Sequence, residues 1–476
     1  MIRRDPSGAS ALRYDLIVVG GGIYGVTLAL EAARRGRRPL LLERGDFGQA
    51  TSWNSLRIVH GGLRYLQTLD FRRFRESVGE RSWFLRNFPD LVEPLPCLMP
   101  LYGRGLKRNA VLRRVLAWND LLSSRRNEGL RLDRVLPRSR VITAEETVAL
   151  FPGVRRNGLQ GAALWYDAVM PDSQRLIVEL LHWACAEGAV ALNHVEAVGL
   201  LQDGQGIRGL SGQDRLSGER FEFEAGVVVN CSGPWCRELA RRFDRDVPQL
   251  FRPSLAFNLF IDRAPLSTAA LAVAPEPAGS PVYFVHPWKE RMLAGTYHAP
   301  WSGGPDDGPP GEDSTKSFLS QLRSALPDLA VGPREVLRVH WGLLPAARPG
   351  TALLSRRELI HDHGAAGSRR GLYSVSGVKF TTARLVAEKT LRGVFPGETA
   401  GPGSPPAPAS PPRAEAFRAL LARDPAAARA VVERLTRDEA ALTVDDLLLR
   451  RTDWGVVPAA GSELAARIAP WVAHRT

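Results

Sequence analysis

The sequence predicts an α/β fold: a Rossmann-like dinucleotide-binding domain interleaved with an α+β domain built mostly on an antiparallel sheet, and a small helical domain at the C-terminus. Three observations lead to this prediction. Near the N-terminus an apolar strand runs into a glycine-rich turn and then a helix, the order of a nucleotide-binding unit. Apolar segments then alternate with helical patterns up to residue 396. A proline-rich stretch at 397–412 precedes a segment rich in Ala, Leu, Arg and Glu.

The expected elements follow from local patterns of apolar and turn-forming residues. We expect strands at 15–19, 39–42, 226–229, 281–285 and 372–375, helices at 25–35, 172–187 and 381–391, and a loop at 299–313. We assign 1–396 to the body, with nucleotide-binding segments at about 12–90, 150–240 and 335–396 and second-domain segments at about 91–149 and 241–334. Residues 397–412 form a linker, and residues 413–476 form a helical cap domain.

Composition and charge restrict the classes of protein. The 476 residues are 44% hydrophobic and 24% charged, which is typical of a globular chain with several domains. The net charge of +13 fits solvated surface, anionic lipid or an anionic substrate, and no nucleic-acid-binding motif is present. The four cysteines form no Cys-x-x-Cys pair, so we expect no metal site and a reducing, cytoplasmic compartment. We expect neither a signal peptide nor a transmembrane helix.

The first glycine-rich turn carries a dinucleotide-binding fingerprint. The strand at 15–19 leads directly into Gly20-Gly-Gly-Ile-Tyr-Gly25, and a helical pattern follows. Gly20 permits the tight turn, Gly22 lets the backbone approach a pyrophosphate, and Gly25 lets the helix pack closely on the strand. The next strand ends at Glu43, whose carboxylate can accept hydrogen bonds from ribose hydroxyls and disfavours a 2′-phosphate.

Three further segments favour FAD over NAD as the dinucleotide. Residues 50–55 supply hydroxyl groups that could hold a diphosphate, and residues 230–235 place a glycine turn after a strand. Residues 377–382 open a helix near the end of the body. Each segment alone could be a capped turn, but three that converge on one ligand fit a large cofactor.

These motifs resemble those of the FAD-dependent glycerol-3-phosphate dehydrogenases, within the wider glycine oxidase and D-amino-acid oxidase fold group. His60-Gly-Gly-Leu-Arg-Tyr65 and the Gly-x-Lys-x-Thr-Thr-x-Arg block from Gly377 are fairly specific to that family. The matching stretches are Tyr14–Gly25, Ala50–Leu66, Asn119–Glu146, Ala162–Leu176, Asn230–Trp235, Gly377–Glu388 and Leu442–Gly455. The last stretch resembles the helical cap of that family, which favours it over the amino-acid oxidases.

The resemblance implies oxidation of sn-glycerol 3-phosphate to dihydroxyacetone phosphate, with electrons passed to quinone or another acceptor. It implies FAD binding along Gly20, Gly22, Ile23, Tyr24, Gly25, Glu43, Arg44, Thr51, Ser52, Ser55, Gly61, Gly62, Val195, Ser232, Gly233, Gly377, Lys379, Phe380 and Thr381. It places Arg64 and Tyr65 at the substrate phosphate and Lys379 close to flavin and substrate.

Alternatives remain for the catalytic candidates. His60 is a base or substrate contact, or a histidine that fixes the turn beside the flavin. Arg64 either anchors an anion or forms an ion pair on a helix, and Tyr65 either contacts the substrate or belongs to the core. Lys379 either contacts the substrate or the flavin, or it is a surface residue. His298 and His340 are weaker candidates, more often structural.

The second domain departs from the family pattern. The family usually carries an arginine before a proline where this chain has Leu344. The His of a family Lys-Gly-Ser-His segment is missing at 252–255, and Gly295-Thr-Tyr-His298 replaces Gly-Thr-Thr-Asp. Arg338, Arg348 and His298 are candidates to compensate for Leu344. A second hypothesis is therefore a flavoenzyme for a non-phosphorylated hydroxy acid, amine or other metabolite, and a third is a flavin-binding protein without turnover.

Residues 104–140 are strongly basic and contain apolar residues near helical spacing. Such a helix either packs on the body or lies on an anionic membrane. Respiratory members of the family are peripheral membrane proteins, so peripheral contact with the cytoplasmic face of a membrane is a further expectation. A homodimer is compatible with this assignment.

Overall fold

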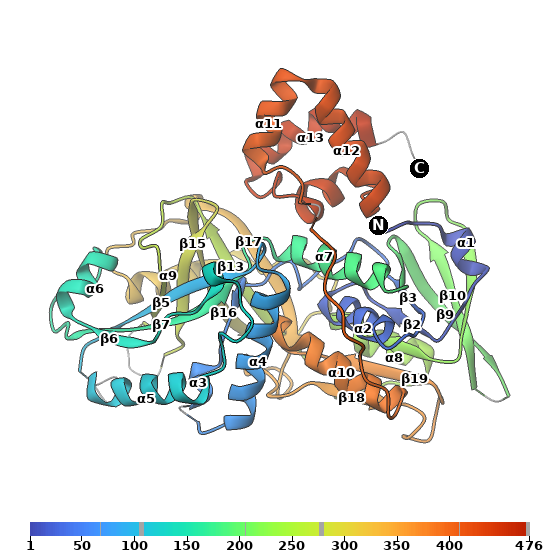
Figure 1. Cartoon of the computed structure of the whole chain (residues 1–476), viewed down its shortest axis with the longest axis horizontal. Helices are drawn as coiled ribbons and strands as arrows, with labels where there is room; N and C mark the ends of the chain where they lie inside the picture. The colour runs from blue at the N-terminus through green and yellow to red at the C-terminus, as the bar shows by residue number, and fades with distance from the viewer. Residues whose placement is uncertain (67, 104–108, 205, 276–279, 409, 473–476) are drawn as a thin grey trace.

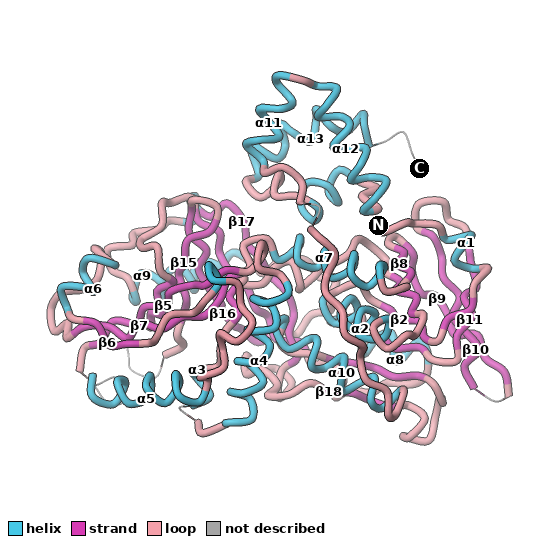
Figure 2. The backbone as a smooth tube through the Cα atoms, in the orientation of Figure 1, coloured by secondary structure: helices cyan, strands magenta, loops and turns pink. Residues whose placement is uncertain are grey.

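The computed structural model describes residues 1–66, 68–103, 109–204, 206–275, 280–408 and 410–472. Within them the strands form three sheets, and a helical unit follows at the C-terminus (Figure 1). Figure 2 shows the strands gathered on two sides of the molecule, with the nine-stranded sheet on the left and the other two on the right. The predicted fold class is confirmed.

A six-stranded sheet forms the centre of the nucleotide-binding part. Its order is β18 (Leu359–Asp362), β19 (Leu372–Ser376), β12 (Val228–Asn230), β2 (Leu16–Val19), β3 (Pro39–Leu42) and β8 (Val190–Leu192). All neighbours are parallel except the antiparallel pair β18–β19. Parallel sheets are covered on both faces, which explains why β2 reads as a continuous apolar run and is fully buried.

The two faces of β2 are buried against different partners. Because side chains alternate along a strand, Leu16 and Val18 join the core made with α2 (Ile23–Ala33), α7 (Ser173–Ala186) and α10 (Ala383–Val394). Ile17 and Val19 point to the opposite face, toward α8 (Cys236–Phe243) and the four-stranded sheet. That sheet has the order β1 (Arg13–Tyr14), β11 (Arg220–Ala225), β10 (Gly206–Asp214) and β9 (Val195–Asp203), and α1 (Pro6–Ser10) contacts β11.

The nine-stranded sheet is antiparallel apart from the parallel pair β14–β5. Its strands are β17 (Val336–Pro345), β13 (Pro253–Ile261), β16 (Arg291–Pro300), β15 (Tyr283–Trp288), β14 (Ala270–Val273), β5 (Glu93–Leu101), β7 (Gly161–Val169) and β4 (Ile58–Val59), with β6 (Arg140–Ile142) paired to β7. The helices of this part are α3 (Leu63–Leu66), α5 (Asn109–Leu122), α6 (Ala144–Leu150) and α9 (Glu312–Ala325). Helix α4 (Phe71–Asn87) instead packs Phe84 and Leu85 into the core that α2, α7 and α10 share.

The structure corrects several predicted boundaries. Strands β4, β7 and β17 lie in segments predicted to bind the nucleotide, yet they pair within the nine-stranded sheet. Helix α2 begins at Ile23 rather than at residue 25, because Gly22 already serves as its N-cap. Smaller shifts place β12 at 228–230, β15 at 283–288, α7 at 173–186 and α10 at 383–394. The loop predicted at 299–313 is shorter by two residues at each end, because β16 ends at 300 and α9 begins at 312.

The C-terminal unit contains α11 (Ala414–Arg423), α12 (Pro425–Glu439), a π-helical turn at Asp446–Arg451 and α13 (Pro458–Val472). Its core centres on Phe417 and Trp454, whose rings stack 3.6 Å apart. The preceding proline-rich segment runs along the body in Figure 1, where Arg34 hydrogen-bonds Gly401. Among the described helices, none is both long and apolar enough to cross a membrane.

Candidate functional site

A cavity of about 590 Å³ lies between the six-stranded and the nine-stranded sheets. Its lining includes these residues predicted to bind the cofactor: Gly20, Gly22, Ile23, Tyr24, Glu43, Arg44, Thr51, Ser52, Ser55, Val195, Ser232, Gly233, Gly377, Lys379 and Phe380. Gly25, Gly61, Gly62 and Thr381 are not among the lining residues, and neither are His60, Arg64 and Tyr65. The structure thus gathers most of the predicted set from five separate segments of the chain.

The glycine turn is held by close backbone packing. Gly20 adopts φ +108°, and a Cβ there would lie 2.6 Å from the carbonyl oxygen of Cys231. A Cβ on Gly25 would lie 1.8 Å from the carbonyl oxygen of Gly20, so only glycine lets α2 approach β2. Ser52 Oγ accepts a hydrogen bond from the amide of Ile23 at 3.0 Å. The N-terminus of α2 therefore lines the cavity beside the hydroxyl groups of Thr51 and Ser52, which is a favourable place for a phosphate.

Glu43 is fixed at the end of β3 by two backbone amides. Its Oε2 accepts from Gly21 N at 2.6 Å and its Oε1 from Gly45 N at 2.8 Å. Burial raises the pKa of this carboxyl, while the two amides oppose that rise. Each oxygen keeps a further lone pair, so the carboxylate can still accept from ribose hydroxyls.

Arg44, Trp235 and Asp306 all line the cavity and form a clasp there. Asp306 accepts from Arg44 Nη2 at 3.1 Å and from Trp235 Nε1 at 2.9 Å. The Arg44 guanidinium also lies over the Trp235 ring, 4.2 Å from its centre. Asp306 belongs to the loop that follows β16, so the clasp joins the two sheets across the cavity. Trp235 and Asp306 were not among the predicted site residues.

The main chain of Lys379 is held at the cavity by the side chain of Tyr24. The Tyr24 hydroxyl donates to Lys379 O at 2.7 Å and accepts from Lys379 N at 3.0 Å. A Cβ on Gly377 would lie 1.8 Å from the Tyr24 ring, so glycine is required for this clamp. Burial lowers the pKa of Lys379 to about 8, with a further contribution from the charge of Arg64. The Lys379 Nζ lies 4.4 Å from the centre of the Tyr65 ring.

Arg64 and Lys379 make one cationic region, and His298 lies within its electrostatic reach. The charge of Arg64 acts on both of the other side chains. Burial, assisted by Arg64, lowers the pKa of His298 to about 4, so the imidazole is neutral at neutral pH. Its Nδ1 is buried and makes no hydrogen bond within the described residues. Leu344 lines the cavity in the place of the expected arginine.

Neither of the other two candidates replaces the missing arginine. Arg338 donates to Gly455 O at 3.0 Å, in the C-terminal unit, and Arg348 is exposed; neither lines the cavity. His340 is buried with Nδ1 3.2 Å from Asn54 Oδ1, and burial lowers its pKa. His298, the third residue considered for compensation, lies within electrostatic reach of Arg64.

His60 is paired with a residue that the sequence reasoning missed. Its Nδ1 lies 3.0 Å from Oδ2 of Asp167, a buried carboxylate on β7. Asp167 Oδ1 also accepts from Gly61 N at 2.7 Å and from Arg81 Nη1 at 3.1 Å. A usable signal existed, because Asp167 is the one charged residue in the otherwise apolar strand Gly161–Val169.

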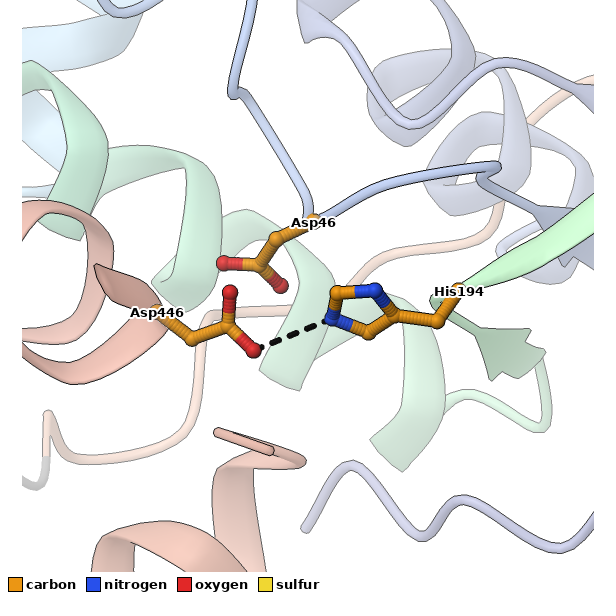
Figure 3. Close-up of side chains that lie close together, drawn as sticks. All are labelled: Asp46, His194 and Asp446. Atoms are coloured by element: carbon orange, nitrogen blue, oxygen red, sulfur yellow. Dashed lines mark hydrogen bonds and ion pairs between the residues drawn. The ribbon is translucent and has the colours of Figure 1, made fainter. Parts of the chain in front are cut away.

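A second polar cluster joins the C-terminal unit to the loop at residues 43–55, called the cofactor loop below, which follows β3 and lines the cavity. Asp46, His194 and Asp446 converge in Figure 3, with His194 Nε2 3.0 Å from Asp446 Oδ2. The cluster does not suit a metal ion, since Asp46 already accepts from Arg451 at 2.6 and 2.7 Å and from Arg450 at 2.8 Å. These arginines supply the positive charge that a cation would bring. Asp46 follows Glu43 by three residues, so the cluster supports the loop that lines the cavity.

The site fits FAD on its own geometry. Gly22 lines the cavity where a side chain would project toward Ser52 Oγ, and the N-terminus of α2 and the Glu43 carboxylate supply groups for a diphosphate and a ribose. The start of α2, the turn after β12 and the segment before α10 line one cavity of about 590 Å³, and a large dinucleotide needs such convergence of separate segments. The fold and the cavity therefore define a dinucleotide-binding oxidoreductase with a separate sheet over the reacting end.

Comparison with known proteins identifies the family. A family model described as FAD dependent oxidoreductase matches residues 15–390. Glycerol-3-phosphate dehydrogenase 1 of Mycobacterium bovis is 32% identical over 93% of this chain and 92% of its own length, and glycerol-3-phosphate dehydrogenase of Synechocystis is 30% identical over 80% and 70%. The solved structure of glycerol-3-phosphate dehydrogenase from Bacillus halodurans complexed with FAD has TM-score 0.70 and 20% identity, over 98% of this chain and 93% of that one.

The chain therefore belongs to the FAD-dependent oxidoreductase family, and within it to the glycerol-3-phosphate dehydrogenases. It is a flavoenzyme with FAD as its cofactor. The predictions of FAD and of an oxidoreductase are confirmed.

Proposed function

We propose that this flavoenzyme oxidises sn-glycerol 3-phosphate to dihydroxyacetone phosphate. The observation that carries the proposal is the match over 93% of this chain and 92% of the length of the mycobacterial relative. The cationic region formed by Arg64 and Lys379 is consistent with a phosphorylated substrate, since both side chains can donate to a phosphate oxygen. Lys379, with its pKa lowered to about 8, still carries its proton at neutral pH.

The reaction separates into a hydride and a proton. Bound FAD supplies the hydride acceptor. We assign the hydroxyl proton to His60, whose side chain is about half exposed and whose Nδ1 is taken by Asp167. Arg64 and Lys379 orient the substrate through its phosphate, and Tyr65 supports Lys379 through its ring. Tyr24 and Gly377 keep the Lys379 backbone at the edge of the cavity.

Leu344 supports a second candidate function. It lines the cavity where a family arginine would hold the phosphate, and leucine cannot form charge-assisted hydrogen bonds. A flavoenzyme for a non-phosphorylated hydroxy acid, amine or related metabolite would need no such arginine. The two functions differ in whether Arg64 and Lys379 suffice to bind a phosphate.

An anaerobic spectrum of the purified holoenzyme tests the proposal. We expect sn-glycerol 3-phosphate to bleach the flavin band, and glycerol at the same concentration to leave it oxidised. A yellow protein that only non-phosphorylated alcohols or amines reduce would support the second function and contradict the first. A flavin that no substrate reduces would indicate a binding protein without turnover.

A variant series separates phosphate binding from folding. Arg64→Ala should raise the Michaelis constant for sn-glycerol 3-phosphate by roughly 10- to 100-fold, the loss expected for hydrogen bonds to a charged group. Arg208→Ala removes an exposed arginine outside the cavity and is the matched control. An unchanged Michaelis constant in Arg64→Ala would refute its role as the phosphate anchor.

We also propose that the electrons pass to a quinone at the cytoplasmic face of an anionic membrane, which α5 contacts. Residues 104–108 of the predicted basic segment lie outside the described residues. In α5, Leu112 and Leu116 are buried against the nine-stranded sheet, while Trp118 and Leu121 are 60% and 71% exposed beside Arg114. An aromatic and an aliphatic side chain beside exposed arginine suit an anionic lipid surface.

Sedimentation with vesicles tests this contact. The enzyme should co-sediment with phosphatidylglycerol vesicles at low salt and less with phosphatidylcholine, and Trp118→Ala should weaken binding. Equal recovery with both lipids would contradict the contact. The oligomeric state, for which we propose a homodimer, is measured by light scattering without lipid.

A further inference from the structure

The geometry points to Asp167 as the positioning residue of His60, holding its ring in the tautomer that leaves Nε2 free to accept the hydroxyl proton. This inference rests on the proposed function. His60 follows β4 and Asp167 lies on β7, two paired strands of the nine-stranded sheet. Their side chains meet at 3.0 Å between Nδ1 and Oδ2. A carboxylate on a buried strand is a rigid support for a half-exposed ring.

Asp167 is surrounded by hydrogen-bond donors. Oδ1 accepts from Gly61 N at 2.7 Å and from Arg81 Nη1 at 3.1 Å, and Oδ2 accepts from Trp165 Nε1 at 3.4 Å. Burial by itself would raise the pKa of Asp167, but the hydrogen bond and charge of His60, then Arg81 and Gly61, outweigh it and lower the pKa. The carboxylate is therefore ionised and can only accept.

The proton on His60 follows from that charge state. An ionised carboxylate cannot donate, so the 3.0 Å contact requires Nδ1 of His60 to carry the hydrogen. In a neutral imidazole the other nitrogen then lacks a proton and is the acceptor. Nε2 is thereby set as the basic atom. The same carboxylate stabilises the imidazolium after Nε2 takes a proton.

Arg81 holds the carboxylate of Asp167 in place by a hydrogen bond. It is buried, and its Nη1 donates both to Asp167 and to Tyr166 O at 2.7 Å. A Cβ on Gly61 would lie 2.0 Å from Arg81 Nη1, so glycine at 61 lets the guanidinium pass under the turn. Asp167 therefore fixes both the ring of His60 and the main chain of the next residue.

The chemical step balances with this assignment. The C–H bond at the secondary carbon breaks as its hydride passes to FAD, the O–H proton passes to Nε2 of His60, and the C–O bond becomes a carbonyl. In the variant Asp167→Asn, the side-chain amide of the new asparagine can donate to Nδ1 of His60. This favours the opposite tautomer, with the proton on Nε2. That tautomer cannot accept the substrate proton at Nε2.

Stopped-flow reduction of the holoenzyme by sn-glycerol 3-phosphate tests the inference. Asp167→Asn should slow flavin reduction by about 10²- to 10⁴-fold while the substrate concentration for half-maximal rate changes little. In a His60→Ala background the same Asp167→Asn change should add less than about threefold, because residues that act as one unit are not additive. A further loss above tenfold in that background would overturn the inference, as would a less than threefold effect in the single variant.

Asp244→Asn is the matched control. It breaks another buried Asp–His contact, between Asp244 Oδ2 and His363 Nδ1 at 2.8 Å, and neither residue lines the cavity. Its flavin reduction rate should stay within about threefold of the parent enzyme. A comparable fall in both variants would show that loss of any buried Asp–His pair suffices, which would overturn the specific role of Asp167.

A spectroscopic readout does not depend on the substrate. With ¹⁵N-labelled histidine and His60→Gln to assign the signal, neutral His60 should carry its proton on Nδ1 in the parent enzyme and on Nε2 in Asp167→Asn. A parent enzyme with the proton on Nε2 would overturn the inference. If sn-glycerol 3-phosphate fails to reduce the parent flavin while the tautomer is as expected, the proposed substrate is wrong and the positioning of His60 stands.

Discussion

Arg451→Met tests how the C-terminal unit is held to the cofactor loop. Methionine is an apolar side chain of similar length, but the substitution removes two hydrogen bonds to Asp46, at 2.6 and 2.7 Å, one to Glu439 O at 2.8 Å and one to Ala440 O at 3.3 Å. Arg451 and Asp46 are both fully buried. Breaking a buried ion pair by removing one partner costs about 3–5 kcal/mol, since the remaining charge is left without its partner in a medium of low polarity.

The expected value lies at the lower end of that range. Arg450 Nε still donates to Asp46 at 2.8 Å, and Asn193 Nδ2 donates at 2.9 Å, so the carboxylate is not left bare. We therefore expect Arg451→Met to lower the free energy of unfolding by about 3 kcal/mol. Asp46→Asn combined with Arg451→Met should recover part of the loss, because the stranded charge is removed as well.

Equilibrium unfolding in urea, followed by circular dichroism, measures the change. FAD is kept at one saturating concentration in every sample, because bound ligand stabilises the folded state. Arg437→Met is the control, since it removes an arginine from an exposed pair with Asp438 and should leave the unfolding curve unchanged. A loss below about 1 kcal/mol in Arg451→Met, or a double variant less stable than the single one, would refute the reasoning.

Three further outcomes are expected. The rate of flavin reduction at low substrate should fall as pH rises through about 8, because Lys379 is charged below its lowered pKa and neutral above it; Lys379→Arg should remove this fall in a pH-rate profile. Gly25→Ala should yield a protein that purifies without flavin absorbance, because the new Cβ would lie 1.8 Å from Gly20 O. Gly36→Ala is the control: the position has open space but a positive φ, so this variant should lose some stability and keep the flavin. Asp306→Asn should speed FAD dissociation by roughly two- to fivefold in a dilution assay followed by flavin fluorescence. The difference should shrink at high salt, because the ion pair between Asp306 and Arg44 is partly exposed. An unchanged dissociation rate at low salt would argue against the clasp.

The fold class and the cofactor could be predicted because their signals are local. The strand, turn, helix and acidic residue from Asp15 to Glu43 lie within one short stretch. In the structure, Gly20 and Gly25 stand where a Cβ would collide with the neighbouring backbone, as the spacing of the glycines predicts. The hydroxyl-bearing and glycine-bearing segments around Ser52, Ser232 and Gly377 were also picked out from their residues, and all three line the cavity.

Tertiary structure decided the rest, because strand pairing and buried ion pairs join residues distant in sequence. The strand β7 is an apolar run without period-two alternation, and it was not among the strands expected from the sequence. Its place in the nine-stranded sheet, and with it the contact between Asp167 and His60, is set by strand pairing and could not be read from the sequence. The contact between Asp46 and Arg451 spans most of the chain and exists only once the C-terminal unit docks. Leu344 shows the same division: the sequence alone revealed that an arginine is missing, and only packing showed that Arg338 turns toward the C-terminal unit while His298 lies within reach of Arg64.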